Sequence, residues 1–233
     1  MGAVTNEFQR VRTVAKTHNQ FRIAKFCRYA DLVYALNPDL LHVLPAQARF
    51  VPYASVDMTA WRPMPARPLA GRPPVLVHAP SHRGVKGTAH IVAAVERLRG
   101  EGVPIDFRLV EGLTNAEARR QYEAADLVVD QLLAGWYGGL AVEVMALGKP
   151  VVAYLRCEDL AFLPESMRAE LPIVSAEPAT IYAVLKRLLG EDAGQLARLG
   201  ERSRAYVEHW HDPRSIAARL KTDYEGVIAR RRP

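Results

Sequence analysis

Short apolar segments alternate with segments of helical periodicity through the middle of the chain. This alternation is typical of βαβ units, which build a parallel sheet with helices on both faces. Right-handed crossovers between the strands then give a Rossmann-like domain of the α/β class. The predicted strands are residues 75–79, 105–110, 126–131, 151–155 and, more weakly, 173–174. Ligands of such a sheet bind at the carboxyl ends of the strands, which places the loops 80–85, 111–114 and 132–139 on one rim.

The last of these loops ends in Gly138-Gly139, and an apolar helix is predicted to follow as far as Gly148. Neither glycine has a side chain that caps the first N–H groups of the helix, so these donors are free for an anion. Glu143 lies within the first turns and can accept hydrogen bonds from hydroxyl groups. The pattern indicates a site for a sugar-bearing nucleotide. A tight turn, with Glu143 favoured by the helix dipole alone, explains the same residues structurally.

The loop from Ser81 to Gly87 places Arg83 and Lys86 between a strand and a helix. Lysine binds phosphate as a point charge and arginine binds it through two parallel hydrogen bonds, although a solvated loop can carry the same cations. Neither His78 nor His82 has an Asp or Ser at triad-like spacing, so neither is nominated as a general base. His78, in a buried strand, is expected to be neutral and hydrogen-bonded.

Four further residues lie on the predicted rim. Asp130 and Gln131 end a strand there, and they either reach a ligand or cap the loop that follows. Trp136 and Tyr137 either line a pocket with their apolar faces and polar tips or pack over the loop. The sequence leaves both pairs of alternatives open.

The flanking segments suggest how the chain is divided. A helix at 7–29 and short strands at 31–36 and 48–53 offer too little apolar surface to bury a sheet of their own, so residues 1–57 are interpreted as the end of another domain. The proline-rich residues 58–74 are a predicted linker. The Rossmann-like domain is assigned to residues 75–208. The remainder of the chain is helical, with predicted helices at 178–189, 192–210 and 213–230.

Composition sets limits on the partners and on the cellular location. The chain has 233 residues, and its net charge of +6 is scattered over the sequence. Such a balance suits phosphate-bearing small molecules, an anionic membrane face or nucleic acid, but unclustered charge gives no specific support for nucleic acid. Cys27 and Cys157 lie far apart, so neither a disulfide framework nor a zinc site is expected. Without a secretion signal or a bilayer-spanning run, the chain is expected to be cytoplasmic, with peripheral attachment to the inner membrane face left open.

Taken together, several segments in order resemble the retaining GT-B glycosyltransferases of family 4, the group 1 transferases. The resemblance runs from Ala30 to Pro213. The matching segments are Ala30–Val33, Phe50–Asp57, Lys86-Gly87, Gly139-Leu140, Glu143 and Gly148–Val152. It implies the C-terminal, nucleotide-sugar-binding half of a GT-B fold preceded by a truncated remnant of the N-terminal acceptor domain. Residues 209–233 are then expected to cross back toward that remnant.

The resemblance also implies roles for residues. Lys86 would hold the donor diphosphate, and Glu143 would hold the ribose hydroxyls. The backbone of Gly138, Gly139 and Leu140 would contact the sugar or phosphate. Glu111-Gly112 would lie near the base. The transferases of this family need no metal and no cofactor besides the nucleotide-diphosphate sugar. The candidate catalytic residues are therefore Lys86, Arg83 and Glu143. The other candidate donor-binding residues are Ser81, Glu111, Gly112, Asp130, Gln131, Tyr137, Gly138, Gly139 and Leu140.

Three features depart from the family pattern. The first glutamate of the family's E-x7-E motif would stand at Gly135, which puts the contact to the transferred sugar in doubt; Asp130, Gln131 or Tyr137 are the candidate substitutes. The family's phosphate-binding arginine would stand at Pro80, so Arg83 is a nearby replacement. Most of the acceptor domain, with its histidine, is missing from the pattern.

Two functions follow as hypotheses. In the first, the chain is an enzyme of glycan or polysaccharide biosynthesis that transfers a sugar from a UDP-, GDP- or similar nucleotide-diphosphate donor to an acceptor hydroxyl, with retention of configuration. Lys86, Arg83 and the helix start would stabilise the charge growing on the leaving diphosphate. In the second, the chain is a nucleotide-sugar-binding module or half-enzyme, and a partner chain supplies the acceptor domain. The acceptor itself is unknown in both.

Overall fold

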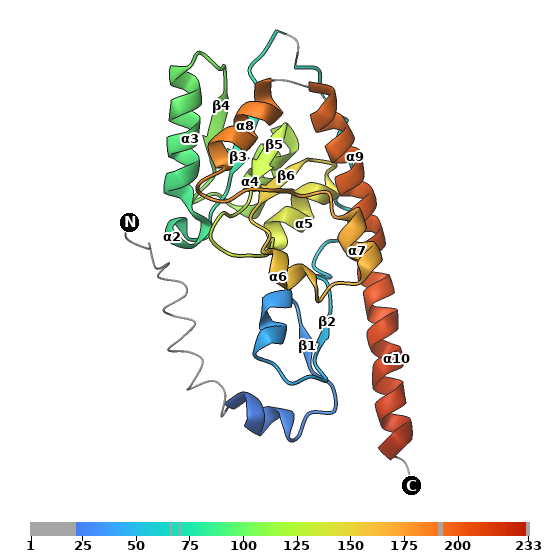
Figure 1. The fold of residues 1–233 in the computed structure, drawn as a ribbon. Coiled ribbons are helices and arrows are strands. Elements are labelled where there is room, and N and C mark those ends of the chain that lie inside the picture. Colours follow the sequence, from blue (N-terminus) through green and yellow to red (C-terminus); the bar gives the residue numbers. More distant parts are fainter. Residues whose placement is uncertain (1–21, 66, 70, 191–192, 232–233) are drawn as a thin grey trace, which may run out of the picture.

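A computed structural model of the chain describes residues 22–65, 67–69, 71–190 and 193–231. Most of the helix predicted at 7–29 lies outside these residues; within it, residues 22–27 are helical. The fold consists of a parallel sheet enclosed by helices, with a small two-stranded sheet beside it (Figure 1).

The main sheet confirms the predicted α/β class. Its five strands are all parallel and lie in the order β4-β3-β5-β6-β7. The strands are β3 (Val75–His78), β4 (Asp106–Leu109), β5 (Leu127–Val129), β6 (Val151–Ala153) and β7 (Val174–Ser175). From β3 the chain moves to β4 on one side of β3, and from β4 it crosses to β5 on the other side. The direction in which strands are added therefore reverses between β3 and β5. Such a switch point is where ligands bind in doubly wound sheets.

Successive side chains of each strand point to opposite faces, and both faces are buried. Val77 and Val128 pack on one side with residues of α4 (Asn115–Ala124) and α5 (Gly139–Ala146). Leu76 and Leu127 pack on the other side with residues of α3 (Thr88–Gly100) and α8 (Ile181–Gly190). Helix α9 (Ala193–Trp210) contacts both α5 and α8.

Some local structure differs from the sequence-based expectation. The segment 80–85, expected to be a loop, contains the start of a short helix, α2 (Arg83–Lys86), because His82 caps it by accepting from the Val85 N–H at 3.3 Å. Two further short helices, α6 (Cys157–Leu160) and α7 (Glu165–Glu170), were not predicted. Neither is long enough to show a helical period in the sequence.

The N-terminal part forms a separate small sheet of two parallel strands, β1 (Tyr34–Ala35) and β2 (Arg49–Phe50), joined by the 3-10 helix η1 (Pro38–His42). The long helix α10 (Pro213–Arg231) runs alongside this sheet (Figure 1). Asp223 of α10 accepts from the Tyr34 hydroxyl at 2.7 Å and from Arg49 at 3.0 Å. The C-terminal helix therefore contacts the beginning of the described chain.

A buried polar network fastens the loop before α5 to the rest of the fold. Nδ1 of His211 donates to the carbonyl of Tyr53 at 2.8 Å, so Nε2 accepts from the Tyr137 hydroxyl at 2.9 Å. The Tyr206 hydroxyl of α9 in turn lies 3.0 Å from that of Tyr137. The hydrogen bonds of three buried side chains are thereby satisfied, as burial requires.

Within the described residues, no helix combines the length and the apolar character that crossing a membrane requires.

Candidate functional site

Lys86 and Asp130 meet at the switch point of the sheet. Lys86 ends α2, shortly after β3, and Asp130 follows β5 directly. The Lys86 ammonium donates to Oδ1 of Asp130 at 2.6 Å and to Oε1 of Gln131 at 2.6 Å. The Lys86 side chain is 12% exposed and that of Asp130 is 0% exposed. A shielded cation therefore lies at the carboxyl edge of the sheet.

The backbone around Lys86 is fixed by Gly87. This residue has φ 75°, a conformation that favours glycine. A Cβ at Gly87 would lie 3.2 Å from Cβ of Leu132, so the turn also packs closely against the loop that follows β5. The Leu132 N–H donates to the Lys86 carbonyl at 3.1 Å, which joins the two rim loops.

The start of α5 lies at the same place. The N-cap is Gly138, as predicted, and a Cβ there would be 3.3 Å from Nζ of Lys86. The Gly138 N–H donates to Oδ2 of Asp130 at 2.7 Å, which corrects the expectation that all of the first donors are free. Within the described part of the chain, no group accepts from the N–H of Gly139 or Leu140. Gly139 faces open space, since a Cβ there would meet nothing within 4 Å.

Glu143 lies on α5 about one turn further on and is half-buried. No described residue donates a hydrogen bond to its carboxylate or forms an ion pair with it. Burial raises the pKa of Glu143. Burial, and after it the charges of Glu143 and Asp130, raise the pKa of Tyr122, so both carboxylates lie near this hydroxyl. Glu143 therefore belongs to the same neighbourhood as Asp130 and has capacity for a ligand hydroxyl.

Arg83 and Glu111 pair with each other at the outer side of the rim. Nε of Arg83 donates to Oε1 of Glu111 at 2.9 Å, and Nη2 donates to Oε2. The hydrogen bond from Arg83 lowers the pKa of Glu111. Both side chains are exposed to solvent, as are Ser81 and Gly112. This ion pair joins the loop after β3 to the loop after β4. Arg83, the predicted phosphate-binding arginine, is therefore already paired with the carboxylate of Glu111.

Trp136 and Tyr137, which the sequence left either lining a pocket or packing over the loop, are both buried. Tyr137 is 1% exposed and Trp136 is 3% exposed. Trp136 packs edge-on against Phe50 of β2 with ring centroids 5.8 Å apart. The Tyr137 hydroxyl is bonded to Tyr206 and His211, which favours packing over the loop, and a contact of Tyr137 with the donor stays a prediction.

Gln131 and His78 also have structural partners. The amide nitrogen of Gln131 donates to the Trp136 carbonyl, so this side chain holds the rim loop besides accepting from Lys86. His78 is fully buried, with Nδ1 2.8 Å from the Val129 carbonyl and Nε2 2.9 Å from Oγ1 of Thr88. Burial lowers the pKa of His78. The expectation of a neutral, hydrogen-bonded histidine is confirmed.

A cluster that the sequence did not reveal closes the space beside Gly135. A Cβ at Gly135 would lie 2.8 Å from Cβ of Arg156 and 3.2 Å from Oδ2 of Asp159. Asp159 is fully buried, and its Oδ1 lies 2.9 Å from Nε2 of His42. His42 belongs to η1 and lies 117 positions from Asp159 in the sequence, so no local motif could have indicated this pair. The side chains of His42, Arg156 and Asp159 thus fill the space beside Gly135.

No group of His, Cys, Asp and Glu side chains among the described residues is arranged to hold a metal ion.

No protein-family model matches the chain, and no curated protein matches it. Several solved structures are similar to it. Sucrose-phosphate synthase from Thermosynechococcus elongatus aligns with a TM-score of 0.60 at 20% identity, over 86% of this chain and 59% of that one. Anabaena HepE in complex with UDP-glucose aligns with a TM-score of 0.63 at 17% identity, over 89% and 68% of the two chains. The GtfA/B complex aligns with a TM-score of 0.56 at 14% identity, over 89% and 47%.

These likenesses concern the fold. The chain has the α/β fold of the C-terminal, Rossmann-like half of the GT-B glycosyltransferases, as predicted. It spans 59% of the length of the sucrose-phosphate synthase chain.

Proposed function

We propose that the chain is the nucleotide-sugar-binding part of a retaining glycosyltransferase, with residues 75–208 as the donor domain, 58–74 as the linker and 1–57 as a remnant of the acceptor domain. The observation that carries the proposal is the meeting of Lys86 with the start of α5, where a Cβ at Gly138 would lie 3.3 Å from the ammonium. A lysine and unpaired helix N–H groups form a site for a diphosphate. Its position at the switch point of the sheet agrees with this use.

The diphosphate and the ribose of a nucleotide sugar have matching groups in this arrangement. The diphosphate would lie against Lys86 and the N–H groups of Gly139 and Leu140. The carboxylate of Glu143 would accept from the ribose hydroxyls, which would supply the partners that it lacks among the described residues. Arg83, if it leaves Glu111, would approach the diphosphate from the outer side of the rim. UDP is our first choice of nucleotide because the HepE structure contains UDP-glucose.

In the reaction, the bond between the anomeric carbon and the diphosphate oxygen breaks while an acceptor hydroxyl attacks from the same face of the sugar, and the proton of that hydroxyl passes to the leaving diphosphate oxygen. Negative charge grows on the leaving diphosphate. Lys86 and the fixed N–H dipoles of α5 would stabilise that charge without reorganising, which is electrostatic preorganisation rather than acid–base catalysis by a side chain. We propose that no metal takes part, since these groups already supply positive potential.

Calorimetric titration of the purified chain with UDP, GDP and ADP tests the proposal. We expect selective binding of one nucleotide, and affinity about tenfold or more lower in Lys86→Ala and in Glu143→Ala, because each removes a charged partner of the ligand. Lys221→Ala is the control, because it removes the same charge from an exposed lysine of α10 that pairs with Glu225. Unchanged affinity in Lys86→Ala, or no binding of any nucleotide, would refute the proposed site.

Melting curves accompany this titration. Lys86→Ala leaves the fully buried Asp130 without its cation, and such a loss destabilises a fold. Glu143→Ala breaks no recorded contact of the carboxylate, so its effect on affinity is separable from an effect on folding. The configuration of the sugar in the product, measured by NMR on the transferred anomeric carbon, tests retention.

A second candidate function is a half-enzyme completed by a partner chain. It is favoured by the small sheet of β1 and β2, because parallel strands normally occur inside larger sheets with both faces covered. Large apolar side chains near this sheet are exposed, namely Phe26, Tyr29, Leu36 and Leu40. The similarity to the GtfA/B complex is consistent with a partner. Binding of UDP without sugar transfer by the chain alone, and transfer after addition of a chain that supplies an acceptor domain, would favour this function.

The cytoplasmic location expected from the sequence, with or without attachment to the inner membrane face, goes with both candidate functions. Detection of the chain in fractionated cells tests it.

A further inference from the structure

A pocket of about 420 Å³ lies at the amino edge of the sheet, opposite the rim that carries Lys86. It is bounded by residues that precede β5 and β6, by the linker and by the first turns of α9. Asp126 precedes β5 and borders this pocket, whereas Asp130 follows the same strand and belongs to the donor site. Apolar lining is provided by Met64, Pro68, Leu69, Pro150, Leu196 and Ala197. The volume is in the range of small-molecule sites.

Lys149 is part of the pocket wall, and the end of α5 fixes its position. Gly148 has φ 73° and its N–H donates to the Met145 carbonyl at 2.9 Å. The Lys149 N–H donates to the Val144 carbonyl at 3.0 Å. These two bonds form a Schellman motif, which ends the helix and directs the chain into β6. Lys149 therefore has a defined backbone position rather than a mobile loop position.

The ammonium of Lys149 has no protein partner within the described part of the chain. The residue is only 5% exposed, yet no described side chain or carbonyl is bonded to Nζ, and no described carboxylate lies within ion-pair distance. Burial lowers the pKa of Lys149, and the charge of Arg67 lowers it further, while Asp126 and Glu123 act in the opposite direction. Nζ of Lys149 is not among the fully buried atoms without a partner in the described part of the chain, so it reaches the pocket space, where an anion that enters would pair with it.

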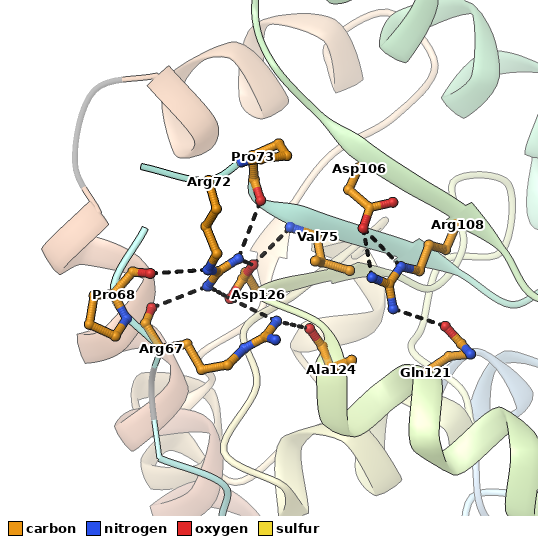
Figure 2. A network of polar contacts seen from close by, with 10 residues as sticks. All are labelled: Arg67, Pro68, Arg72, Pro73, Val75, Asp106, Arg108, Gln121, Ala124 and Asp126. Carbon is orange, nitrogen blue, oxygen red and sulfur yellow. Dashed lines mark hydrogen bonds and ion pairs between the residues drawn. The ribbon is translucent and has the colours of Figure 1, made fainter. Parts of the chain in front are cut away.

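The nearby carboxylate of Asp126 is bound by other groups, which Figure 2 shows. Arg72 binds both of its oxygens, at 2.6 and 2.8 Å, and the Val75 N–H donates to Oδ2 at 2.8 Å. Arg67 lies 3.7 Å from the same carboxylate and donates to the Ala124 carbonyl. One aspartate thus faces two arginines and a lysine, which leaves the wall of the pocket positive.

We propose that this pocket binds a small organic anion whose acidic group pairs with Lys149 and whose apolar part lies against Leu69, Leu196 and Ala197. The acidic group is a carboxylate or a phosphate monoester, since a lysine accepts both as a point charge. The site is separate from the donor site and on the opposite edge of the sheet. It does not depend on the proposed transferase activity.

Calorimetric titration of the full chain with octanoate, octyl phosphate and 1-octanol tests the proposal, because these probes share one tail and differ in the head group. We expect octanoate, octyl phosphate or both to bind to one site per chain, and 1-octanol to bind at least about tenfold more weakly. Lys149→Met should lower the affinity for the anions by about tenfold or more and leave the affinity for 1-octanol unchanged. Saturating UDP should not displace them.

Two further variants keep the test decisive. Lys221→Met removes an exposed positive charge elsewhere and should leave the binding of octanoate and octyl phosphate unchanged. Ala197→Phe fills the pocket while retaining Lys149, so it should abolish binding even if Lys149→Met fails to fold. The proposal is overturned if neither anion binds, if 1-octanol binds as tightly as the anions, or if binding persists in a folded Lys149→Met or Ala197→Phe chain.

Discussion

The carboxylate of Asp130 lies between two groups that a diphosphate needs, with Oδ1 2.6 Å from the Lys86 ammonium and Oδ2 2.7 Å from the Gly138 N–H. In the structure, therefore, an internal carboxylate satisfies the cation and one donor of the helix start. A bound diphosphate would compete with Asp130 for both. The arrangement keeps a partly buried lysine paired while the site holds no ligand.

This competition predicts that Asp130→Asn strengthens nucleotide binding. The amide oxygen of an asparagine still accepts from Gly138, but the negative charge that opposes the phosphates is lost. We expect the affinity for the preferred nucleoside diphosphate to rise by about tenfold, measured by calorimetry. Asp126→Asn is the matched control, because Asp126 precedes the same strand and lies at the opposite edge of the sheet. Weaker binding in Asp130→Asn would show instead that Asp130 positions Lys86 for the ligand.

Glu143 is expected to lower the stability of the free protein. Burial raises the pKa of Glu143, so the folded state disfavours its ionised form, and this residue costs stability as the pH rises through the folded pKa. At pH 8, Glu143→Gln should raise the free energy of unfolding by about 1 kcal/mol, or Tm by about 2–4 °C. The same change should weaken nucleotide binding.

Glu123→Gln is the control for this prediction, because Glu123 is paired with Arg119 on α4 at 2.9 Å. Its loss should change Tm little and in the destabilising direction. If Glu143→Gln melted at a lower temperature than the wild type at pH 8, the carboxylate would have a stabilising partner, and its assignment to a ligand hydroxyl would be wrong.

Some of this site could be predicted from the sequence because the evidence for it is local. The start of α5 at Gly139 follows from two consecutive glycines before an apolar period, and the hydrogen-bonded state of His78, though not the identity of its partners, follows from its place in a buried strand. The pairing of Lys86 with Asp130 could not be predicted, because 44 positions separate them and only the adjacency of β3 and β5 brings them together. Strand adjacency is set by the packing of the whole sheet rather than by any local motif.

The same reason explains why the sequence left the alternatives for Tyr137 open. A tyrosine in a rim loop is a typical candidate for a ligand contact. The partners of Tyr137, however, are Tyr206 and His211, which lie 69 and 74 positions later in the sequence. The expected alternative, packing over the loop, became evident only once α9 was placed. Likewise, the polar cluster of His42, Arg156 and Asp159 beside Gly135 combines η1 with α6, and α6 itself was too short to predict.

The buried position of His211 is expected to make the protein less stable in mild acid. Burial lowers the pKa of His211 from 6.5 to about 4. The unfolded chain therefore takes up a proton below about pH 6.5 that the folded chain does not take up until about pH 4, so stability is complete above the first value and falls toward the second. This difference corresponds to at most about 3 kcal/mol. His78 adds to the effect in the same direction, since burial lowers its pKa too.

Urea unfolding between pH 4 and pH 8 checks this prediction. His211→Gln should be less stable than the wild type at pH 8, because it breaks the bonds to Tyr53 and Tyr137, but its stability should fall less steeply toward pH 4. His90→Gln, which changes an exposed histidine of α3, should keep the slope of the wild type. Equal slopes in the wild type and His211→Gln would contradict the assignment of the titration to His211.

Two glycines in helices should respond to alanine with opposite signs. A Cβ at Gly200 of α9 would lie 2.2 Å from the carbonyl oxygen of Gly148, so alanine would force α9 away from the end of α5. A Cβ at Gly100, the last residue of α3, would meet nothing within 4 Å. We expect Gly200→Ala to lower the free energy of unfolding by about 3 kcal/mol, whereas Gly100→Ala should raise it by up to about 1 kcal/mol through its helix propensity. Urea unfolding of both variants measures the difference. A Gly200→Ala chain as stable as the wild type would mean that α9 does not lie against the Gly148 turn, and the wall that Lys149 forms with α9 would then be in question as well.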